Sequence, residues 1–420
     1  MHGTTTLTLS LVIVAAVALP ANRAAGEPIV DWNQKALEVA VAAEATSGAV
    51  QARTLAIMHL AIHDALNTIE PRYRTYAASE GASPSASPAA AVAGAARGVL
   101  SRLFPAQASL VDAPYQSALA VIPDGEPKRS GLALGDRIAE QLVARRAGDH
   151  FTINPPYAWR APAPGVFQPV PPLLSLTSAL TGLAHATPFV MDGRSQFRAP
   201  GPPALTSREW TRDFNDARSL GAANSTTRTA DQTAAAHFWG ETSSTQAWNR
   251  VARPLVATQG KDLWESARLF ALLNVAIADV AVAVFEAKYQ YHFWRPITAI
   301  RQAAADGNPD TAPDTTWSPL LATPSHPEYP SGHAGYCAAA AQVMAFLLGD
   351  NVRFSTTSPT SVPAGQIRSY ASFPQMAKEC SDSRVWAGIH FWTACEHAAA
   401  QGRQVGEWVT QRFLGPVKGR

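Results

Sequence analysis

The chain has 420 residues, of which 47% are hydrophobic, so it can bury a large core as one large domain or two ordinary ones. Its 34 basic and 32 acidic residues give a formal net charge of +2, which provides no bulk attraction for nucleic acid or an anionic membrane. A functional positive charge must therefore be local. The 32 prolines and 27 glycines indicate long irregular connections between elements.

Residues 1–25 contain a short apolar run, Leu9–Leu19, that ends before Pro20. The run is too short to span a membrane comfortably, and small residues follow it, so we expect a cleaved export signal. An uncleaved anchor is the alternative. A signal peptide would make the mature protein secreted or periplasmic.

The next part of the chain is typical of packed helices, and no alternating strand pattern competes with them. On one of them, His63 and Asp64 are better explained by hydrogen bonds to neighbouring helices than by catalysis. A flexible loop rich in Ala, Ser, Gly and Pro is expected at 77–88. The predicted helices are Asp31–Ala45, Gln51–Thr68, Ala89–Phe104, Gln107–Val121 and Arg129–Arg146.

A proline-rich loop at 154–203 is expected to wrap the surface and help to wall a cleft. After it, Thr206-Ser-Arg-Glu209 fits a capping box for a helix through about Leu220, and a second helix starts near Thr229. We assign 26–250 to an N-terminal helical part.

The longest helical pattern, from Lys261 to about Phe293, opens a C-terminal helical part at 251–420. Its apolar centre is long enough for a membrane span. Asn274 and Asp279 interrupt that centre, which favours a buried bundle helix instead. We therefore expect no membrane span in the mature chain.

Lys288 and Arg295 are seven residues apart at the end of this helix, a spacing that returns to nearly the same helical face. Pro296 places Arg295 just past the helix end. Such a pair alone is usually solvated, but aromatic neighbours such as Tyr289 and Trp294 suggest an enclosed pair that needs an anionic partner.

The stretch from Pro324 to His333 reads Pro-Ser-His-Pro-Glu-Tyr-Pro-Ser-Gly-His, and an Ala-rich helix follows it up to Gly349. Ser331 is a candidate N-cap, Gly332 lets a ligand approach the backbone, and the free N–H groups of the first turn bind oxyanions. His333 could transfer a proton. For the tripeptide alone, a simple helix cap with an exposed histidine is equally plausible.

The third motif is Ser383-Arg384, followed six residues later by His390. This spacing keeps Arg384 and His390 off one helical face, so we expect Arg384 in the turn before a helix and His390 inside it. Together, three cations, two histidines and the helix start would form a site for a tetrahedral oxyanion.

The three motifs occur in the order that is shared by vanadium-dependent haloperoxidases and type 2 phosphatidic acid phosphatases. They are Lys288-x6-Arg295-Pro296, Pro-Ser331-Gly332-His333 and Arg384-x5-His390. The chain resembles the exported bacterial haloperoxidase branch. The resemblance implies an all-α fold, which we expect to be two packed four-helix-type bundles within one compact unit.

The resemblance also implies residue roles. His390 matches the histidine that bonds vanadium. His333 matches the acid–base histidine, and Lys288 would polarise bound peroxide. The positions that match those holding the vanadate or phosphate oxygens are Lys288, Arg295, Ser331, Gly332 and Arg384. The implied partners are hydrogen peroxide, a halide and a small organic substrate; nothing indicates the oligomeric state.

His326, seven residues before His333, stands where bromide-preferring relatives often have histidine, so we favour bromide; the alternative is a loop histidine packed against Tyr329. The family commonly has Asp four residues after the metal-bonding histidine, and this chain has Ala394 there. Glu396 is not an obvious substitute to orient the imidazole, whereas a backbone carbonyl could serve.

Two other functions remain open. An acid phosphatase would use His390 as nucleophile and His333 to protonate the leaving group, a role that the missing Asp would weaken. A catalytically silent oxyanion-binding protein is the third reading.

The chain has three cysteines. We predict a Cys380–Cys395 disulfide that closes a short loop and leaves Cys337 buried and free.

Overall fold

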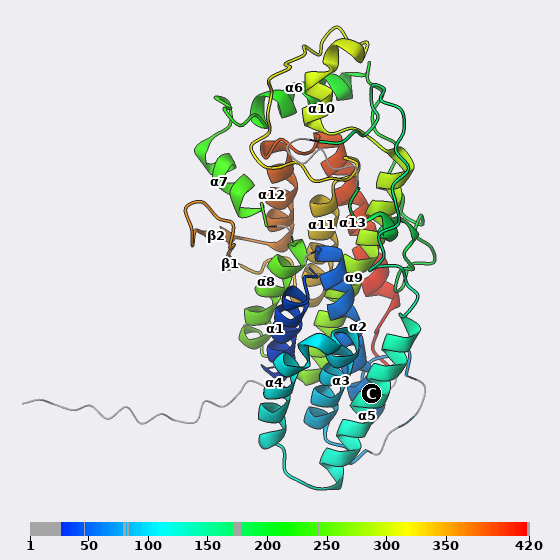
Figure 1. Ribbon diagram of the computed structural model, residues 1–420. Helices are drawn as coiled ribbons and strands as arrows, with labels where there is room; N and C mark the ends of the chain where they lie inside the picture. Colours follow the sequence, from blue (N-terminus) through cyan, green and yellow to red (C-terminus); the bar gives the residue numbers. More distant parts are fainter. Residues whose placement is uncertain are drawn as a thin grey trace, which may run out of the picture.

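The structure is a computed structural model that describes residues 27–45, 47–78, 81, 84–170, 178–241 and 243–417. The predicted export signal lies outside these residues. Helices make up most of the described chain, which confirms the predicted all-α class (Figure 1). The helices are α1 (Glu27–Ala42), α2 (Gly48–Ile69), α3 (Pro88–Leu103), α4 (Ala108–Ala120), α5 (Glu126–Arg145), α6 (Arg208–Leu220), α7 (Ala230–Phe238), α8 (Ser244–Thr258), α9 (Leu263–Tyr291), α10 (Pro296–Arg301), α11 (Gly332–Leu348), α12 (Phe373–Trp386) and α13 (Trp392–Arg412), with short 3-10 turns at Pro105–Gln107, Thr181–His185 and Ala303–Ala305.

The long helices form two groups. In one, α2, α3 and α5 pack on one another with α1 and α4 beside them; in the other, α9, α11, α12 and α13 pack together (Figure 1). Contact between α2 and α9 joins the groups. Close approach within each group depends on glycine. A Cβ on Gly135 of α5 would meet Ala91 O of α3 at 2.2 Å, and one on Gly402 of α13 would meet Gly335 O of α11 at the same distance.

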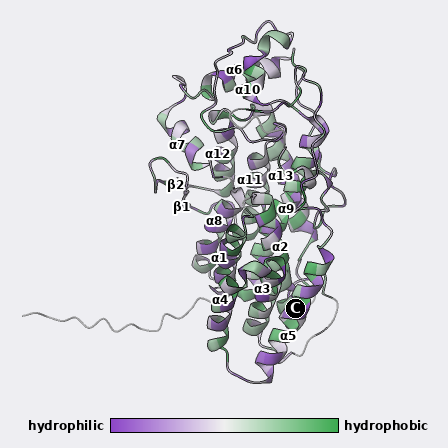
Figure 2. Cartoon of the chain, in the orientation of Figure 1, coloured by the Kyte–Doolittle hydropathy of each residue, from purple (hydrophilic) through white to green (hydrophobic). Residues whose placement is uncertain are grey.

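Helix α9 has the length and apolar composition of a membrane span, yet its apolar window is completely buried inside the protein. Hydropathy colouring shows α9 and α11 as largely hydrophobic, whereas α5 carries several hydrophilic residues (Figure 2). Asp279 on α9 is buried, and its carboxylate accepts hydrogen bonds from the backbone N–H groups of Phe189, Val190 and Met191. The prediction of a buried bundle helix is confirmed, and its central carboxylate fastens part of the proline-rich segment.

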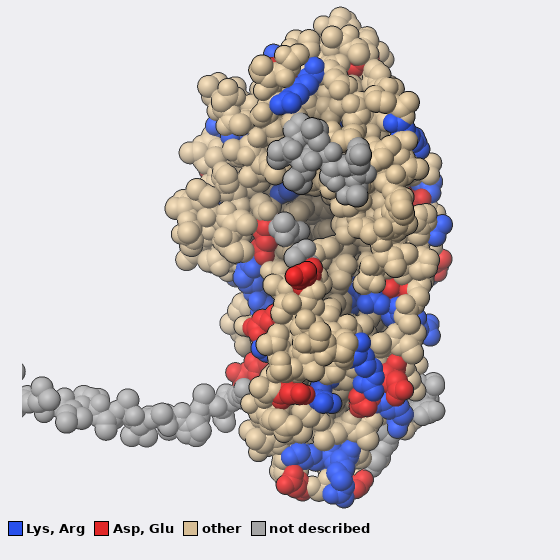
Figure 3. Space-filling view, in the orientation of Figure 1, with Lys and Arg blue, Asp and Glu red and all other residues tan. Residues whose placement is uncertain are grey.

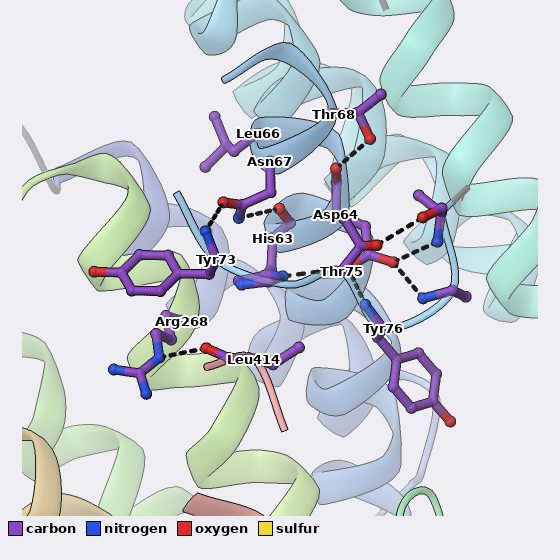
Figure 4. A network of polar contacts seen from close by, with 12 residues as sticks. His63, Asp64, Leu66, Asn67, Thr68, Tyr73, Thr75, Tyr76, Arg268 and Leu414 are labelled. Atoms are coloured by element: carbon purple, nitrogen blue, oxygen red, sulfur yellow. Dashed lines mark hydrogen bonds and ion pairs between the residues drawn. The ribbon is translucent and has the colours of Figure 1, made fainter. Parts of the chain in front are cut away.

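His63 and Asp64 have the structural role that was favoured, but their partners lie in the segment after α2 and not in neighbouring helices. Asp64 accepts hydrogen bonds from the backbone N–H groups of Tyr76, Ala77 and Ala78, and His63 Nδ1 lies 3.2 Å from Asp64 Oδ1 (Figure 4). Both side chains are completely buried. They hold the segment after α2 against the helix, far from any of the predicted motif residues in the fold.

Two local predictions need correction. Ser207, and not Thr206, is the N-cap of α6, because its hydroxyl accepts the N–H of Trp210 at 3.1 Å. The predicted start at Thr229 is confirmed, with a full capping box to Gln232. A short antiparallel hairpin, β1 (Phe354–Thr357) paired with β2 (Ile367–Tyr370), was not expected. With four residues per strand, its alternation is too brief to read from sequence.

The predicted disulfide is wrong. Cys337 on α11 is bonded to Cys380 on α12, with their Cα atoms 6.6 Å apart, and Cys395 is a free buried thiol. The two helices pack side by side, so these cysteines face each other across the interface. Cys395 lies on α13 and packs instead against Ala334, Val385 and Ala398.

Candidate active site

The three motifs converge on one place in the C-terminal helical group. Lys288 lies in the last turn of α9, and Arg295 is the N-cap of α10, just past the end of α9 as predicted. Ser331 is the N-cap of α11, although its hydroxyl makes no capping bond. Arg384 and His390 depart from prediction: Arg384 lies in the last turn of α12, and His390 lies in the connection between α12 and α13. Gly388, at φ 76°, turns the chain between them.

Lys288 is completely buried and holds the motif loop in place. Its ammonium donates to Pro327 O at 2.9 Å and to Glu328 O at 2.8 Å, which leaves one N–H for a further acceptor. Burial lowers the pKa of Lys288 well below its usual value, and the nearby positive charge of Arg295 lowers it further. A bound anion would favour its charged form.

Arg295 is also completely buried, and its guanidinium bridges two sides of the site. It donates to His326 O and to Ile389 O, while its two terminal nitrogens contact His326 Nδ1 at 3.0 Å and His390 Nε2 at 3.3 Å. Burial lowers its pKa to about 10, so Arg295 remains charged at neutral pH. It therefore donates to His390 Nε2, whereas His326 Nδ1 also lies 3.1 Å from Pro327 O, so that nitrogen either accepts from Arg295 or donates to Pro327.

The contacts of His390 determine which ring nitrogen carries the proton. A guanidinium can only donate, so Nε2 accepts from Arg295 and carries a lone pair. In the neutral ring the proton is then on Nδ1, which donates to Glu328 Oε1 at 2.7 Å. Burial, together with Arg295 and Lys288, lowers the pKa of His390 well below its usual value. Neutral imidazole with an unprotonated Nε2 is the form that bonds a metal, which would take the lone pair that Arg295 now contacts.

Glu328 is a functional residue that the sequence analysis missed. Its carboxylate is completely buried, and the oxygen that accepts from His390 also accepts the N–H of Phe391 at 3.0 Å. Burial raises its pKa to about 8, an effect opposed by Lys288 and Arg295. At neutral pH such a group is largely protonated, and its Oε1 still accepts the N–H of His390. Glu328 thus supplies the carboxyl group that Ala394 cannot, from the loop before α11 instead of from α13.

Neither of the groups considered near Ala394 supports the imidazole of His390. Glu396 is confirmed as no substitute, because it is exposed and lies 3.5 Å from Arg212. The support for His390 comes from a side chain and not from the backbone carbonyl that seemed available. The sequence does contain a carboxylate in the stretch Pro327-Glu328-Tyr329-Pro330, but only the fold shows that this loop faces His390.

Two buried donors at the site have no hydrogen-bond partner in the described part of the chain, namely Ser331 Oγ and Arg384 Nε. Arg384 does donate through Nη1 to Trp239 O, and burial lowers its pKa to about 10, so it stays charged. An unpaired buried donor costs about 1–3 kcal/mol. The unused Nε of Arg384, which lines the same cavity as His390, therefore fits a tetrahedral oxyanion such as vanadate or phosphate.

His333 and His326 line the adjoining cavity together with Gly332, Arg384 and His390. His333 Nε2 donates to Glu241 O at 2.9 Å, so its Nδ1 carries the lone pair. Burial lowers the pKa of His333 to about 3, and Arg384 contributes to the shift. His326 packs edge-on against Phe285, at 5.1 Å between ring centroids, and not against Tyr329 as the alternative proposed.

Comparison with known proteins agrees with this site. The model of the second helical-bundle domain of VCPO matches residues 268–419, which hold every motif residue. Vanadium chloroperoxidase of Curvularia inaequalis is 28% identical over 396 residues, a match that covers 75% of this chain and 64% of that relative. The structure described as the first bacterial vanadium-dependent iodoperoxidase superposes with a TM-score of 0.79 at 25% identity, covering 94% of this chain and 98% of the other. Residues 268–419 thus belong to the vanadium haloperoxidase family, and the fold of nearly the whole chain is similar to that of a family member.

A second solved vanadium haloperoxidase, the holo form of a bacterial chloroperoxidase, matches with a TM-score of 0.69 over 87% of this chain and 91% of the other. At 19% identity this match concerns the fold alone.

On the face drawn in Figure 3, Lys and Arg are interspersed with Asp and Glu. The concentrated positive charge of this protein is instead the buried set of Lys288, Arg295 and Arg384.

Proposed function

We propose that this protein is a vanadate-dependent haloperoxidase that oxidises a halide with hydrogen peroxide and thereby halogenates a small organic substrate. One observation carries the proposal. His390 presents a lone pair on Nε2 beside three buried cations, while its other nitrogen is bonded to the buried carboxylate of Glu328. This arrangement suits a metal-centred oxyanion, which needs both a nitrogen ligand and positive donors around its oxygens.

Each residue has a defined part. His390 Nε2 would bond vanadium, and five residues would hold the vanadate oxygens: Lys288, Arg295, Ser331, Gly332 and Arg384. Vanadate supplies Lewis-acid activation of hydrogen peroxide without a change in its own oxidation state. The remaining N–H of Lys288 would stabilise negative charge that develops on the reacting oxygen. His333, fixed through Nε2 on Glu241 O, would exchange a proton through Nδ1.

We propose bromide as the preferred halide. The support is His326, which occupies the position seven residues before His333 and lies against Phe285 in the cavity wall. Relative rates with chloride, bromide and iodide at equal concentration, in wild type and His326→Phe, test this preference. Faster chloride than bromide oxidation by the wild type would contradict it.

An acid phosphatase is the second candidate, because Glu328 removes the main objection to it. A carboxylate bonded to Nδ1 activates a histidine nucleophile as well as it supports a metal ligand. Purified protein, with and without orthovanadate, should be assayed for peroxide-dependent bromination of a phenolic dye and for phosphate-ester hydrolysis. Bromination only with vanadate is the expected result. Hydrolysis without bromination would favour the phosphatase, and vanadate binding without either activity would favour a silent oxyanion-binding protein.

Mutation of the two histidines tests the assigned roles. His390→Ala should abolish vanadate retention, because the metal loses its nitrogen ligand. His333→Ala should retain vanadate and lose turnover. Unchanged bromination in either variant would refute the assignment.

We also propose that the mature protein is secreted or periplasmic. The Cys337–Cys380 disulfide supports this location, since disulfides persist mainly in oxidising compartments. Mass spectrometry of the N-terminus of the exported protein would test for removal of about the first 25 residues.

A further inference from the structure

The cavity next to the oxyanion site has a volume of about 630 Å³, which is large enough for a small organic molecule. Four motif residues and His326 form one side of it; the four are Gly332, His333, Arg384 and His390. The other side is mostly apolar and includes Leu180, Phe285 and Leu321. Among the described residues that line the cavity, Arg384 is the only arginine or lysine, and no carboxylate takes part. The cavity therefore favours an uncharged molecule with apolar surface.

Leu180 in this wall has an unusual backbone. Its φ of 62° and ψ of 30° lie in the left-handed region, which costs a non-glycine residue energy and is seldom adopted without a reason. A glycine would avoid that cost, yet the chain places a leucine here. We therefore take the apolar side chain of Leu180, and not its backbone conformation, as the feature that this position contributes to the cavity wall.

Hydrogen bonds on both sides keep Leu180 in this conformation. Ala179 N donates to Ser325 O at 2.8 Å, which ties it to the motif loop, and Thr181 N donates to Asn154 Oδ1 at 2.8 Å. Tyr289 of α9 also donates to Ala179 O. The leucine is consequently fixed against the loop that carries His326, and its position in the wall does not depend on its own contacts alone.

We propose that this wall binds the organic acceptor, so that halogenation takes place inside the cavity, and that Leu180 determines which acceptors fit. The ligand class is an uncharged aromatic molecule such as a phenol or naphthol. The inference rests on the proposed haloperoxidase activity. Halide, hydrogen peroxide and a proton give hypohalous acid and water, a two-electron oxidation of the halide. The ring then attacks the halogen, the halogen–oxygen bond breaks, and the ring proton leaves with the hydroxide as water.

The test compares a large and a small acceptor, 2-naphthol and phenol, in the vanadate-loaded enzyme. Leu180→Gly removes the side chain and suits the positive φ, and Leu180→Ala removes it while the backbone cost remains. We expect the ratio of kcat/KM for 2-naphthol over phenol to fall about tenfold in both variants, since an apolar contact of this size is worth roughly that factor. Leu414, at φ 49° and remote from the cavity, provides the matched control: Leu414→Gly should keep the wild-type ratio.

A wild-type ratio in both Leu180 variants would overturn the proposal. A second measurement distinguishes a wrong acceptor site from a wrong enzymatic activity. It follows triiodide formation from iodide and hydrogen peroxide by the wild type without any organic acceptor. Triiodide with an unchanged acceptor ratio contradicts only the acceptor site. Absence of triiodide contradicts the haloperoxidase activity itself. Binding of 2-naphthol without halide or peroxide, followed by its fluorescence, should weaken in Leu180→Gly; equal affinity would also overturn the inference.

Discussion

At the scale of single residues, the imidazole of His390 is held by Glu328, a residue 62 positions earlier in the chain. The identities of Lys288, Arg295, Arg384 and His390 could be predicted because their motifs are local. The support for His390 could not be predicted, since it is a contact between two loops that the sequence separates. Spacing rules describe one helix at a time, and neither loop is a helix.

Glu328→Gln should weaken vanadate binding by about 10–100-fold, the usual effect of removing a group that orients a metal ligand. The amide retains a similar shape, but it cannot ionise and is a weaker acceptor for the Nδ1–H of His390 than the carboxylate that Glu328 forms above its pKa of about 8. Equilibrium dialysis of vanadate measures the change. Glu396→Gln is the control, because Glu396 is exposed and pairs with Arg212. If both variants bound vanadate as the wild type does, the assigned role of Glu328 would be wrong.

His59 should make the fold sensitive to acid. It is completely buried, its Nε2 accepts from Asn33, its Nδ1 has no partner in the described chain, and burial lowers its pKa to about 3. The unfolded chain binds this proton near pH 6.5, so the stability is present above that pH and is lost as the pH falls. Between pH 6.5 and 5 the loss is about 2 kcal/mol. Urea unfolding of His59→Gln should show a correspondingly smaller pH dependence; equal slopes would contradict this account.

At the scale of elements, helix type and approximate bounds followed from apolar periodicity, as in α2 and α9. The ends depended on single side chains, such as Ser207 in place of Thr206. Which helices touch could not be read from periodicity, because close packing is decided by small residues that carry little hydropathy signal. The contact of α11 with α13 is such a case.

Gly402→Ala should destabilise the protein by about 1–3 kcal/mol, because the new Cβ would meet backbone Gly335 O at 2.2 Å and force α13 from α11. Vanadate affinity should fall as well, since α11 carries Ser331 and Gly332. Thermal unfolding and dialysis provide the two measurements. Gly148→Ala is the control, with nothing within 4 Å of the added Cβ. Normal stability in Gly402→Ala would show that the interface can relax.

The disulfide joins α11 to α12 one helical turn away from His333 and from Arg384. Thiol titration of the denatured protein should find one thiol before reduction and three after it. Removing both bonded cysteines should cost about 4 kcal/mol, from the chain entropy of a loop of 43 residues. Cys395→Ala should leave no thiol before reduction. Three free thiols in the oxidised wild type would contradict the pairing.

At the scale of the whole molecule, the site draws together segments from α9 to the start of α13, so a bound anion contacts parts of the chain that only folding unites. Vanadate or phosphate at 100 times its Kd should therefore stabilise the protein by about 2.7 kcal/mol. The melting temperature should rise by a few degrees, whereas chloride at equal ionic strength should not raise it. No rise with vanadate would indicate that the buried cations do not form an anion site.

The free thiol of Cys395 has a further consequence if the proposed activity, which makes a hypohalous acid, is correct. Cys395 lies beside Ser331, yet it is 1% exposed among alanine and valine side chains, and burial raises its pKa. Oxidants attack the thiolate, so a buried and protonated sulfur is a poor target. The packing that places this cysteine next to Ser331 would thus also protect the protein from the oxidant that the proposed reaction makes.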